Sequence, residues 1–441
     1  MSLGLRGLLV VYSLLIEAVV WFALVPALWV RSLLHRAGDA ERSQRLARAP
    51  RASPPRSPAT RPVLLHAVSV GEMNAAAPLV AELGAHGCRV LLTTGTHAGL
   101  LTAERIAREH ATVDTCVYLP WDRRAVRGWL RATEPAAVVV METEIWPNLF
   151  AACEALKIPL FIANGKIRAA DVRKYRFARA FFGRVLDSAM WIGVQTERER
   201  DRFAAIGAPV DRVEVAGNLK FDAALREQPP PERLEPDPAG RPLVVAGSTH
   251  DPEEGWLLEC VRSLAADGRA VRLVLAPRDV TRAAGIARRA QALGVRSLLW
   301  SERPANPVAP WDVLVLDQYA TLRACYASAD LVVIGGTFVP VGGHNLLEAA
   351  AVARPMLVGP YVDGISALVD PFAAAGALMS LSGRDPVREL TDACRQLLDN
   401  PDRARAMGAK AAAICRQGSG SAEHHARAIL GHIYSTPRSR K

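Results

Sequence analysis

The sequence predicts an α/β fold with two Rossmann-like, doubly wound domains that follow an N-terminal membrane anchor helix. Short β-branched runs alternate with helical patterns along most of the 441 residues, which is typical of parallel sheets with helical crossovers. A proline-rich break at residues 224–241 divides this alternation into two series. An apolar stretch at residues 7–30 precedes both series and predicts the anchor.

The apolar stretch and its flanks, residues 1–35, are assigned to the membrane anchor. A helix needs about 20 apolar residues to cross a bilayer, so residues 7–30 are long enough to span it. Glu17 is the only charge in the stretch, and together with Pro26 it leaves a tilted or interfacial helix open as the alternative. We therefore expect the membrane surface to be a partner of the chain.

Residues 36–62 are predicted to form a basic tether rich in proline, serine and arginine. Residues 31–61 contain eight arginines and two acidic residues, a local net charge of +6 within a formal net charge of +10 for the chain. Such a segment stays on the cytoplasmic side of a membrane and attracts anionic headgroups, although a solubilising linker has the same composition. We expect the folded body on the cytoplasmic face of the inner membrane. The absence of interleaved aromatic residues and of a helix-turn-helix pattern argues against nucleic acid as a partner.

The first folded domain is predicted at residues 63–225 and the second at residues 240–433. Strands are expected in the runs VLLHAV, RVLLTT, AAVVVME, PLFIAN and WIGVQT, and then in PLVVAGST, VRLVLAP, DVLVLD, LVVIGG and PMLVGP. From about Val387 the sequence is helical without further strands. Two such domains in tandem bring the carboxyl ends of both sheets to a shared cleft, which is the GT-B arrangement.

The segment HAVSVGE ends at Glu72, between a strand and a helix. A carboxylate at a helix N-terminus is favoured by the helix dipole, and at a strand end it can serve as a general base for an acceptor hydroxyl. The alternative is that Glu72 only caps the helix.

The segment METEIWPNL places Glu142 and Glu144 at the end of an apolar strand. The pair could carry out acid–base chemistry or hold a basic group or a sugar, and the alternative is that both are solvated loop carboxylates. Lys220, in the segment GNLKFD, and Arg278, at the end of VRLVLAP, could supply cations to a phosphate or to a sugar carboxylate, although either could be an ordinary surface charge.

The segment GGTFVPVGGHNLLEAAA, residues 335–351, leads from a strand through a glycine-rich loop into a helix near Asn345. Such loops let backbone amides approach a phosphate, and Glu348 could accept hydrogen bonds from a ribose. The loop matches neither GxGxxG nor a Walker A sequence, so nicotinamide cofactors and ATP hydrolysis are not indicated. A plain tight crossover is the alternative.

No metal and no other cofactor are expected. His250 and His344 lie at strand ends, but no HxH, HExxH or DxD sequence accompanies them. The seven cysteines are odd in number and contain no CxxC pair, which indicates neither a zinc site nor a disulfide framework and fits a reducing compartment.

Six motifs follow one another along the chain: HAVSVGE, METEIWPNL, GNLKFD, GSTHDPEE, APR and GGHNLLEAAA. In their order and approximate spacing they resemble those of the bacterial Kdo (3-deoxy-D-manno-octulosonic acid) transferases, which are N-terminally anchored GT-B enzymes. The resemblance extends from the anchor nearly to the C-terminus. It implies transfer of Kdo from CMP-Kdo to a glucosamine hydroxyl of a lipid A precursor in lipopolysaccharide core biosynthesis, with inversion at the anomeric carbon and without a metal.

The resemblance also implies roles for individual residues. Glu72 falls on the catalytic base of the family, and Glu142 and Lys220 fall on its transition-state stabilisers. The implied CMP-binding positions are Pro277, Arg278, Tyr319, Ala320, Thr321, Asn345, Leu346, Leu347 and Glu348.

The sequence departs from the family pattern at four places. Residues 164–168 read NGKIR where the family has NARLS, and Asp279 follows Arg278 where a histidine is usual. Residues 319–321 read YAT instead of MGE, and residues 361–364 read YVDG instead of HTFN. Contacts to the donor are expected to differ at these positions.

Two other functions fit part of the pattern. The glycine-rich loop and Glu348 alone would also suit a UDP-sugar-using GT-B transferase or epimerase. A non-catalytic, membrane-anchored protein that binds a lipid or a nucleotide could keep the same fold, although the retention of Glu72, Glu142 and Lys220 argues against it.

Overall fold

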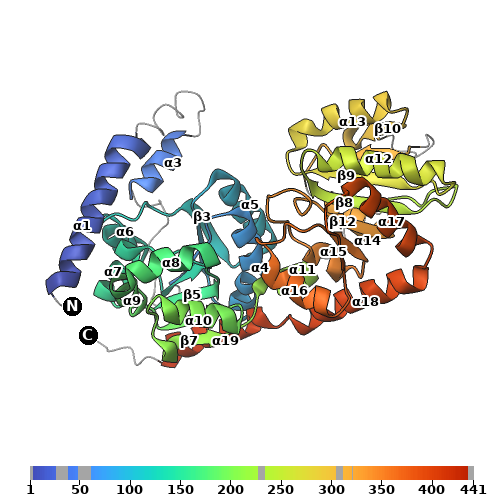
Figure 1. Cartoon of the computed structure of the whole chain (residues 1–441). Helices are drawn as coiled ribbons and strands as arrows, with labels where there is room; N and C mark the ends of the chain where they lie inside the picture. Colours follow the sequence, from blue (N-terminus) through green and yellow to red (C-terminus); the bar gives the residue numbers. More distant parts are fainter. Residues whose placement is uncertain are drawn as a thin grey trace. The chain divides into compact units, whose positions relative to one another are not determined.

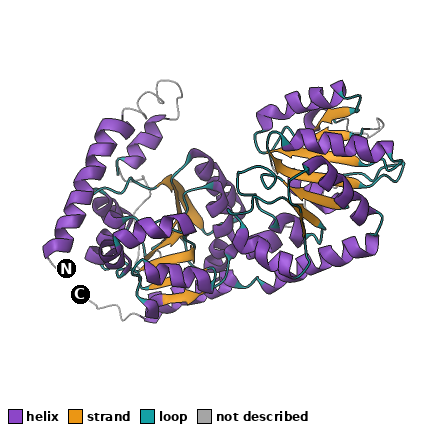
Figure 2. Cartoon of the chain, in the orientation of Figure 1, coloured by secondary structure: helices purple, strands orange, loops and turns teal. Residues whose placement is uncertain are grey.

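The computed structural model describes residues 3–25, 38–47, 61–226, 234–303, 311–319 and 321–435, and it confirms two parallel-sheet, Rossmann-like domains (Figures 1 and 2). The chain divides into two compact units. The first unit comprises Met1–Ala223 together with Gly418–Lys441, and the second comprises Ala224–Gln417.

The first unit is built on a seven-stranded sheet of order β3-β2-β1-β4-β5-β6-β7, in which every strand pair is parallel. The strands are β1 (Val63–His66), β2 (Val90–Thr94), β3 (Val113–Tyr118), β4 (Ala137–Met141), β5 (Leu160–Gly165), β6 (Trp191–Val194) and β7 (Val213–Val215). The helices that follow them are α4 (Val70–Ala85), α5 (His97–Glu109), α6 (Val126–Thr133), α7 (Pro147–Leu156), α8 (Ala169–Phe177), α9 (Arg179–Leu186), α10 (Glu197–Ala205) and α11 (Leu219–Arg226).

Both faces of this sheet are buried, which is why its strands are nearly continuous apolar runs. Leu65 of β1 packs into the cluster under α4 and α5, whereas its neighbour Leu64 packs into the cluster on the opposite face. Parallel sheets covered on both faces expose only their strand ends, so chemistry in such a fold is expected at the carboxyl edge.

The C-terminal helix α19 (Ser421–Ser435) belongs to the first unit, not to the second, so the predicted domain boundary at residue 433 is corrected here. Ala426, Ile429 and Leu430 of α19 enter the core beneath α4. The helical pattern after Val387 was predicted from the sequence, but the surface on which its last helix packs depends on tertiary structure.

The second unit repeats the architecture, with strand order β10-β11-β9-β8-β12-β13-β14 and parallel pairing throughout. Its strands are β8 (Leu243–Thr249), β9 (Arg272–Pro277), β10 (Ser297–Leu299), β11 (Val313–Val315), β12 (Leu331–Ile334), β13 (Met356–Val358) and β14 (Met379–Ser380). Its α-helices are α12 (Glu253–Ala266), α13 (Ala283–Ala292), α14 (Leu322–Ser328), α15 (Leu347–Ala351), α16 (Ser366–Ala374), α17 (Pro386–Leu398) and α18 (Pro401–Gln417).

The N-terminal helix lies on the first unit beside α7 and α9 (Figure 1). It consists of α1 (Leu3–Val19) and a π-helical turn, η1 (Val20–Leu24), and Gly7–Leu24 is long and apolar enough to cross a membrane. Its less exposed side chains recur with helical spacing, at positions 9, 12, 13, 16, 17 and 20.

This inward stripe contains the polar residues Tyr12, Ser13 and Glu17. Tyr12 donates a hydrogen bond to Asp122 (2.8 Å), and Ser13 donates one to Asn148 (2.7 Å). Glu17 forms an ion pair with Arg123 (2.6 Å). The outward side is apolar, with Leu14, Leu15 and Phe22 all more than half exposed. The polarity is thus the reverse of that of a helix on a water-soluble protein.

Part of the predicted tether is ordered, which corrects its assignment. Residues 38–45 form helix α3 (Gly38–Arg45), which packs near β3. Arg45 donates to the carbonyl of Gly95 (2.8 Å), and its guanidinium lies over the ring of Tyr118. Residues 48–60 of the tether lie outside the described part of the chain, as do residues 26–37 of the anchor and tether.

Candidate active site

Glu72 lies in the first turn of α4, where it also takes part in the helix cap. Ser69 is the N-cap residue and accepts a hydrogen bond from the Glu72 amide, while the Glu72 carboxylate accepts one from the Val68 amide (2.8 Å) and one from the Ser69 hydroxyl (3.0 Å). Burial raises the pKa of Glu72 to about 7, and the nearby carboxylates of Glu142 and Glu144 add to this rise. A carboxylate with such a pKa is suited to general base catalysis near neutral pH.

Glu142 and Lys220 form an ion pair at the same edge of the sheet. Oε1 of Glu142 lies 3.1 Å from Nζ of Lys220, but it has no aligned hydrogen-bond donor among the described residues. The backbone of Glu142 is left-handed, with φ of 55°, a conformation that costs a non-glycine residue about 1–2 kcal/mol. A strained, incompletely satisfied carboxylate at a strand end is typical of a functional site.

Glu144 follows two residues later and is held differently, because Trp146 donates a hydrogen bond from Nε1 to its carboxylate (2.6 Å). Burial raises the pKa of Glu144, and the charge of Glu142 contributes to the rise. The charge of Glu142 therefore raises the pKa of both Glu72 and Glu144.

Lys166, which lies in the segment NGKIR that departs from the family pattern, is a further cation at this edge. It follows β5, and burial and the charge of Lys220 lower its pKa, while Glu142 raises it. Alignment of NGKIR with the family's NARLS could have identified it, because Lys166 stands where the family has an arginine of the same charge.

A buried polar network fixes the backbone beneath Lys220. His425 of α19 donates from Nδ1 to the Ser421 carbonyl and accepts at Nε2 from the Asn164 amide (3.0 Å). Asn164, fully buried and left-handed with φ of 58°, accepts at Oδ1 from the Leu219 amide (3.0 Å). Burial lowers the pKa of His425 to about 4, so its ring is neutral and can accept.

In the second unit Glu253 organises the glycine-rich loop. Its carboxylate accepts hydrogen bonds from the amides of Gly336 (2.9 Å) and Phe338 (3.0 Å) in the loop, and from the amide of His250 at the end of β8 (2.9 Å). Glu253 belongs to the motif GSTHDPEE, but the motif by itself predicts no role for it. Because these contacts join segments more than 80 residues apart, the sequence alone does not reveal them.

The predicted CMP-binding residues of the second unit differ in what they can offer a ligand. Asn345 accepts from the Leu347 amide and donates to Glu348 (3.1 Å each). Leu346 and Leu347 are fully buried, so they can contribute only backbone atoms. Arg278 is exposed directly after β9.

The other predicted positions are less constrained. Pro277 is buried as the last residue of β9, and Tyr319 is 69% exposed. Thr321 is the N-cap residue of α14 without a side-chain cap bond. Ala320 lies outside the described residues.

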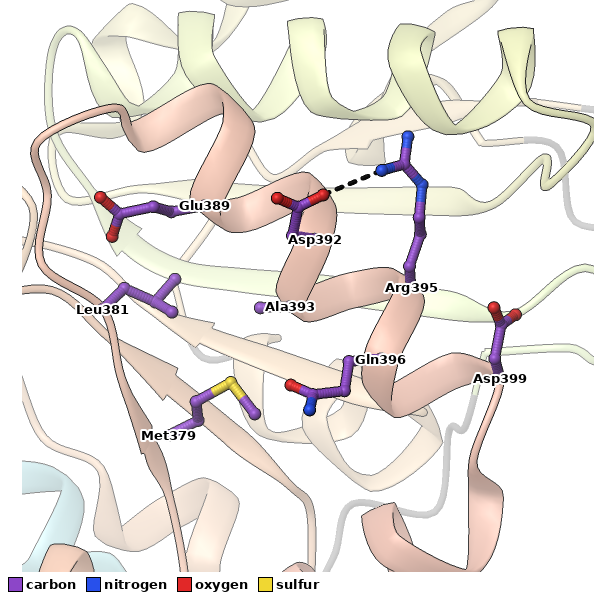
Figure 3. A pocket seen from close by; sticks show the side chains of 8 residues that line it. All are labelled: Met379, Leu381, Glu389, Asp392, Ala393, Arg395, Gln396 and Asp399. Atoms are coloured by element: carbon purple, nitrogen blue, oxygen red, sulfur yellow. Dashed lines mark hydrogen bonds and ion pairs between the residues drawn. The ribbon is translucent and has the colours of Figure 1, made fainter.

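The hollow shown in Figure 3 contains none of these residues. It has a volume of about 560 Å³ and lies between α17 and the segment around β14 (Figure 3). Its charged side chains are already engaged, since Arg395 pairs with Asp392 (2.9 Å) and Asp399 pairs with Arg269 (3.0 Å). Among the described residues, no group of three His, Cys, Asp or Glu side chains is arranged to hold a metal ion.

A family model and several known proteins match the chain as one family. Residues 40–223 match the family model described as 3-deoxy-D-manno-octulosonic-acid transferase. The chain is 33% identical over 366 residues to the 3-deoxy-D-manno-octulosonic acid transferase of Bordetella pertussis, covering 81% of this chain and 84% of that protein. It is 29% identical to the transferase of the same name from Haemophilus influenzae, covering 69% and 72%.

A solved structure of similar fold is that of the putative UDP-N-acetylglucosamine 2-epimerase of Listeria monocytogenes. It aligns with a TM-score of 0.60 over 85% of this chain and 97% of that one, at 16% identity. At this identity the similarity concerns the fold alone.

Proposed function

This chain belongs to the Kdo transferase family, a family of glycosyltransferases that use CMP-Kdo, and from that membership we propose that it transfers Kdo to a lipid A precursor with inversion at the anomeric carbon. Kdo transfer in lipopolysaccharide biosynthesis follows from the family. The lipid A acceptor, the inverting mechanism and the residue roles are the proposal, and they rest on the cluster of Glu72, Glu142 and Lys220.

Glu72 is proposed to be the general base. A glucosamine hydroxyl gives its proton to the Glu72 carboxylate as its oxygen attacks the anomeric carbon of Kdo, and the bond from that carbon to the CMP phosphate breaks. One displacement of this kind inverts the configuration. The pKa of about 7 supports the role, because the carboxylate is partly ionised at neutral pH and still basic enough to accept a proton.

Glu142 and Lys220 are proposed to stabilise the transition state. The anomeric carbon becomes positive as the phosphate leaves, and a carboxylate nearby stabilises that charge. Kdo itself carries a carboxylate, which the cations of Lys220 and Lys166 are suited to bind. The unaligned Oε1 of Glu142 supports this role, since it has capacity left for a ligand.

The second unit is proposed to bind the CMP portion of the donor without a metal. Arg278 would pair with the phosphate, and Glu348 would accept hydrogen bonds from the ribose. Transfer is therefore expected to continue at an unchanged rate in the presence of EDTA. If EDTA abolished transfer and only added divalent metal restored it, this part of the proposal would be contradicted.

The test is Kdo transfer by detergent-solubilised protein, with CMP-Kdo generated in situ and a tetraacylated lipid A precursor as acceptor. Product is read by mass for the wild type and for Glu72→Ala. We expect a shift of one or more Kdo masses with the wild type and at least ~100-fold slower formation with the variant. Equal rates would exclude Glu72 as the base. Thermal protection by UDP but not by CMP would move the donor to a UDP-sugar.

We further propose that the N-terminal helix lies in the cytoplasmic interface of the inner membrane and does not span it. The Tyr12, Ser13 and Glu17 contacts hold its polar side on the folded unit, which a spanning helix could not maintain, while its outward side is apolar. Phe177, 97% exposed at the end of α8, lies on the same unit, three residues after Lys174 and one after Arg176.

The helix proposal is tested by flotation with vesicles containing anionic phospholipid. Phe22→Ser and Phe177→Ser should each reduce binding, and the matched control Leu101→Ser, another exposed apolar residue of the first unit, should not. If a tag at the N-terminus were instead protected from protease because it lies on the far side of the membrane, the helix would span the bilayer.

A further inference from the structure

The second unit contains a histidine pair that none of the roles above uses. Nε2 of His250, at the end of β8, lies 2.8 Å from Nε2 of His344, in the glycine-rich loop. The two rings are nearly parallel, at 8°, with their centroids 5.1 Å apart. A hydrogen bond between two such nitrogens contains a single proton, so one ring donates and the other accepts.

The pair is held against the backbone of the loop. Gly336 has φ of +69°, and a Cβ atom there would lie 2.8 Å from Cδ2 and 2.9 Å from Nε2 of His344. Glu253 binds the amides of both His250 and Gly336, so the two segments that carry the rings share one anchor. The short distance between the rings is therefore built into the fold of this unit.

The charges around the pair disfavour a second proton in the absence of a ligand. Burial lowers the pKa of His344 to about 4, with contributions from His250 and Arg278, and burial and the charges of Arg282 and Arg278 lower the pKa of His250. The charge of Glu254 raises the pKa of His250, but Glu254 already forms an ion pair with Arg282 (2.9 Å). Near neutral pH the free pair is uncharged.

The pair also lies among the residues proposed to bind the donor. Arg278 is close enough to influence both rings, and its amide donates to the carbonyl of Thr249, the residue before His250. His344 directly precedes Asn345. A phosphate bound by Arg278 would bring negative charge close to the two imidazole rings, which together carry no net charge in the free protein.

We propose that His250 and His344 take up one proton when the phosphate of CMP binds, and that the resulting imidazolium–imidazole pair neutralises the phosphate as it leaves. This rests on the proposed function, specifically on CMP-Kdo as donor. The electron pair of the breaking bond passes to the phosphate oxygen, which gains one negative charge that the cationic pair meets. The proton on the pair comes from solvent, and the proton of the acceptor hydroxyl goes to Glu72, so no further reactant is needed.

The test is the number of protons exchanged when CMP binds to the full-length protein in detergent at pH 6.5. Calorimetric titrations in two buffers of different ionisation enthalpy give this number. A negative charge within about 4–6 Å raises the pKa of a basic group by ~1–3 units, so the wild type should take up more protons than His344→Asn or His250→Asn, by up to ~0.7 proton per site. His86→Asn, at an exposed histidine of the first unit, is the matched control and should behave as the wild type.

The outcomes separate this inference from the proposed function. CMP binding without proton uptake by the wild type would overturn the role of the pair while leaving the donor unchanged, and that measurement needs no variant. If folded protein does not bind CMP at all, the donor assignment fails, and the inference fails with it. If the pair has only a structural role, wild type and variants should take up equal numbers of protons, and the variants should transfer Kdo more slowly at every pH. If the pair has the proposed role, the KM for the donor should rise more steeply with pH in the wild type than in the variants.

Discussion

Replacing the proposed base should make the protein less active and, above neutral pH, more stable. The folded-state pKa of Glu72 is about 7 against a reference value of 4.5, because of burial first and then of Glu142 and Glu144. A carboxyl whose pKa is raised by folding makes its full contribution to the free energy of unfolding below pH 4.5. This contribution is lost as the pH rises through 7. At pH 8 the ionised Glu72 therefore costs stability, and Glu72→Gln removes that cost.

The size of the effect follows from the same values. The difference between 4.5 and about 7 corresponds to at most ~3.4 kcal/mol, and since the side chain is partly open to screening by solvent, we expect ~1–2 kcal/mol. Glutamine keeps an oxygen that can accept from Val68 and Ser69. For a unit of this size each kcal/mol shifts the midpoint by ~2–4 °C, so Glu72→Gln should raise Tm by ~2–8 °C at pH 8 and by nothing measurable at pH 4.5.

The assay is thermal unfolding in detergent, followed by tryptophan fluorescence between pH 4.5 and 8, with Kdo transfer measured on the same samples. Glu82→Gln, about ten residues further along α4 and therefore ~15 Å away, is the matched control and should show no dependence on pH beyond that of the wild type. A Tm difference between Glu72→Gln and wild type that is the same at all pH values would refute the argument that ionisation of Glu72 is costly.

Two further predictions concern the groups around Glu72. Lys220→Met should lower kcat/KM for transfer by ~100-fold or more, because Glu142 loses its cation and the Kdo carboxylate loses a partner. Lys220→Arg keeps the charge and should retain more activity. Transfer rates are read by product mass, and similar rates for both variants would count against a role of the charge. His425→Ala should destabilise the first unit by ~1–3 kcal/mol, because the buried Asn164 amide loses its acceptor, and should lower kcat through the backbone that holds Lys220; a normal Tm would show that water replaces the ring.

The sequence predicted the fold where strands are buried on both faces and missed it where they are short or half-exposed. Continuous apolar runs such as residues 137–141 are unambiguous. β3 lies at the sheet edge, where three of its six residues are exposed or half-buried, and β10 and β14 have only three and two residues, so none of them gives a clear pattern. Helix α6, which follows β3, was missed with it.

For the candidate site, the sequence located the carboxylates because strand ends are readable from the pattern. It could not locate partners that folding brings together from distant segments. The pairing of His250 with His344 across 94 residues and the anchoring of Asn164 by His425 across 261 residues both depend on tertiary contacts. A lone histidine in the sequence contains no information about the ring that will face it.

The contacts of the N-terminal helix also impose an order of events during synthesis. The hydrogen bond from Ser13 to Asn148 cannot form until Asn148 has been synthesised, 135 residues later. At a translation rate of about 5–20 residues per second this takes ~7–27 s. Throughout that interval the polar side of the helix has no partner, while its apolar side can already adsorb to a membrane. The first unit would then complete its fold on a helix already at the lipid surface, so the membrane would act as a template for assembly as well as a place of residence.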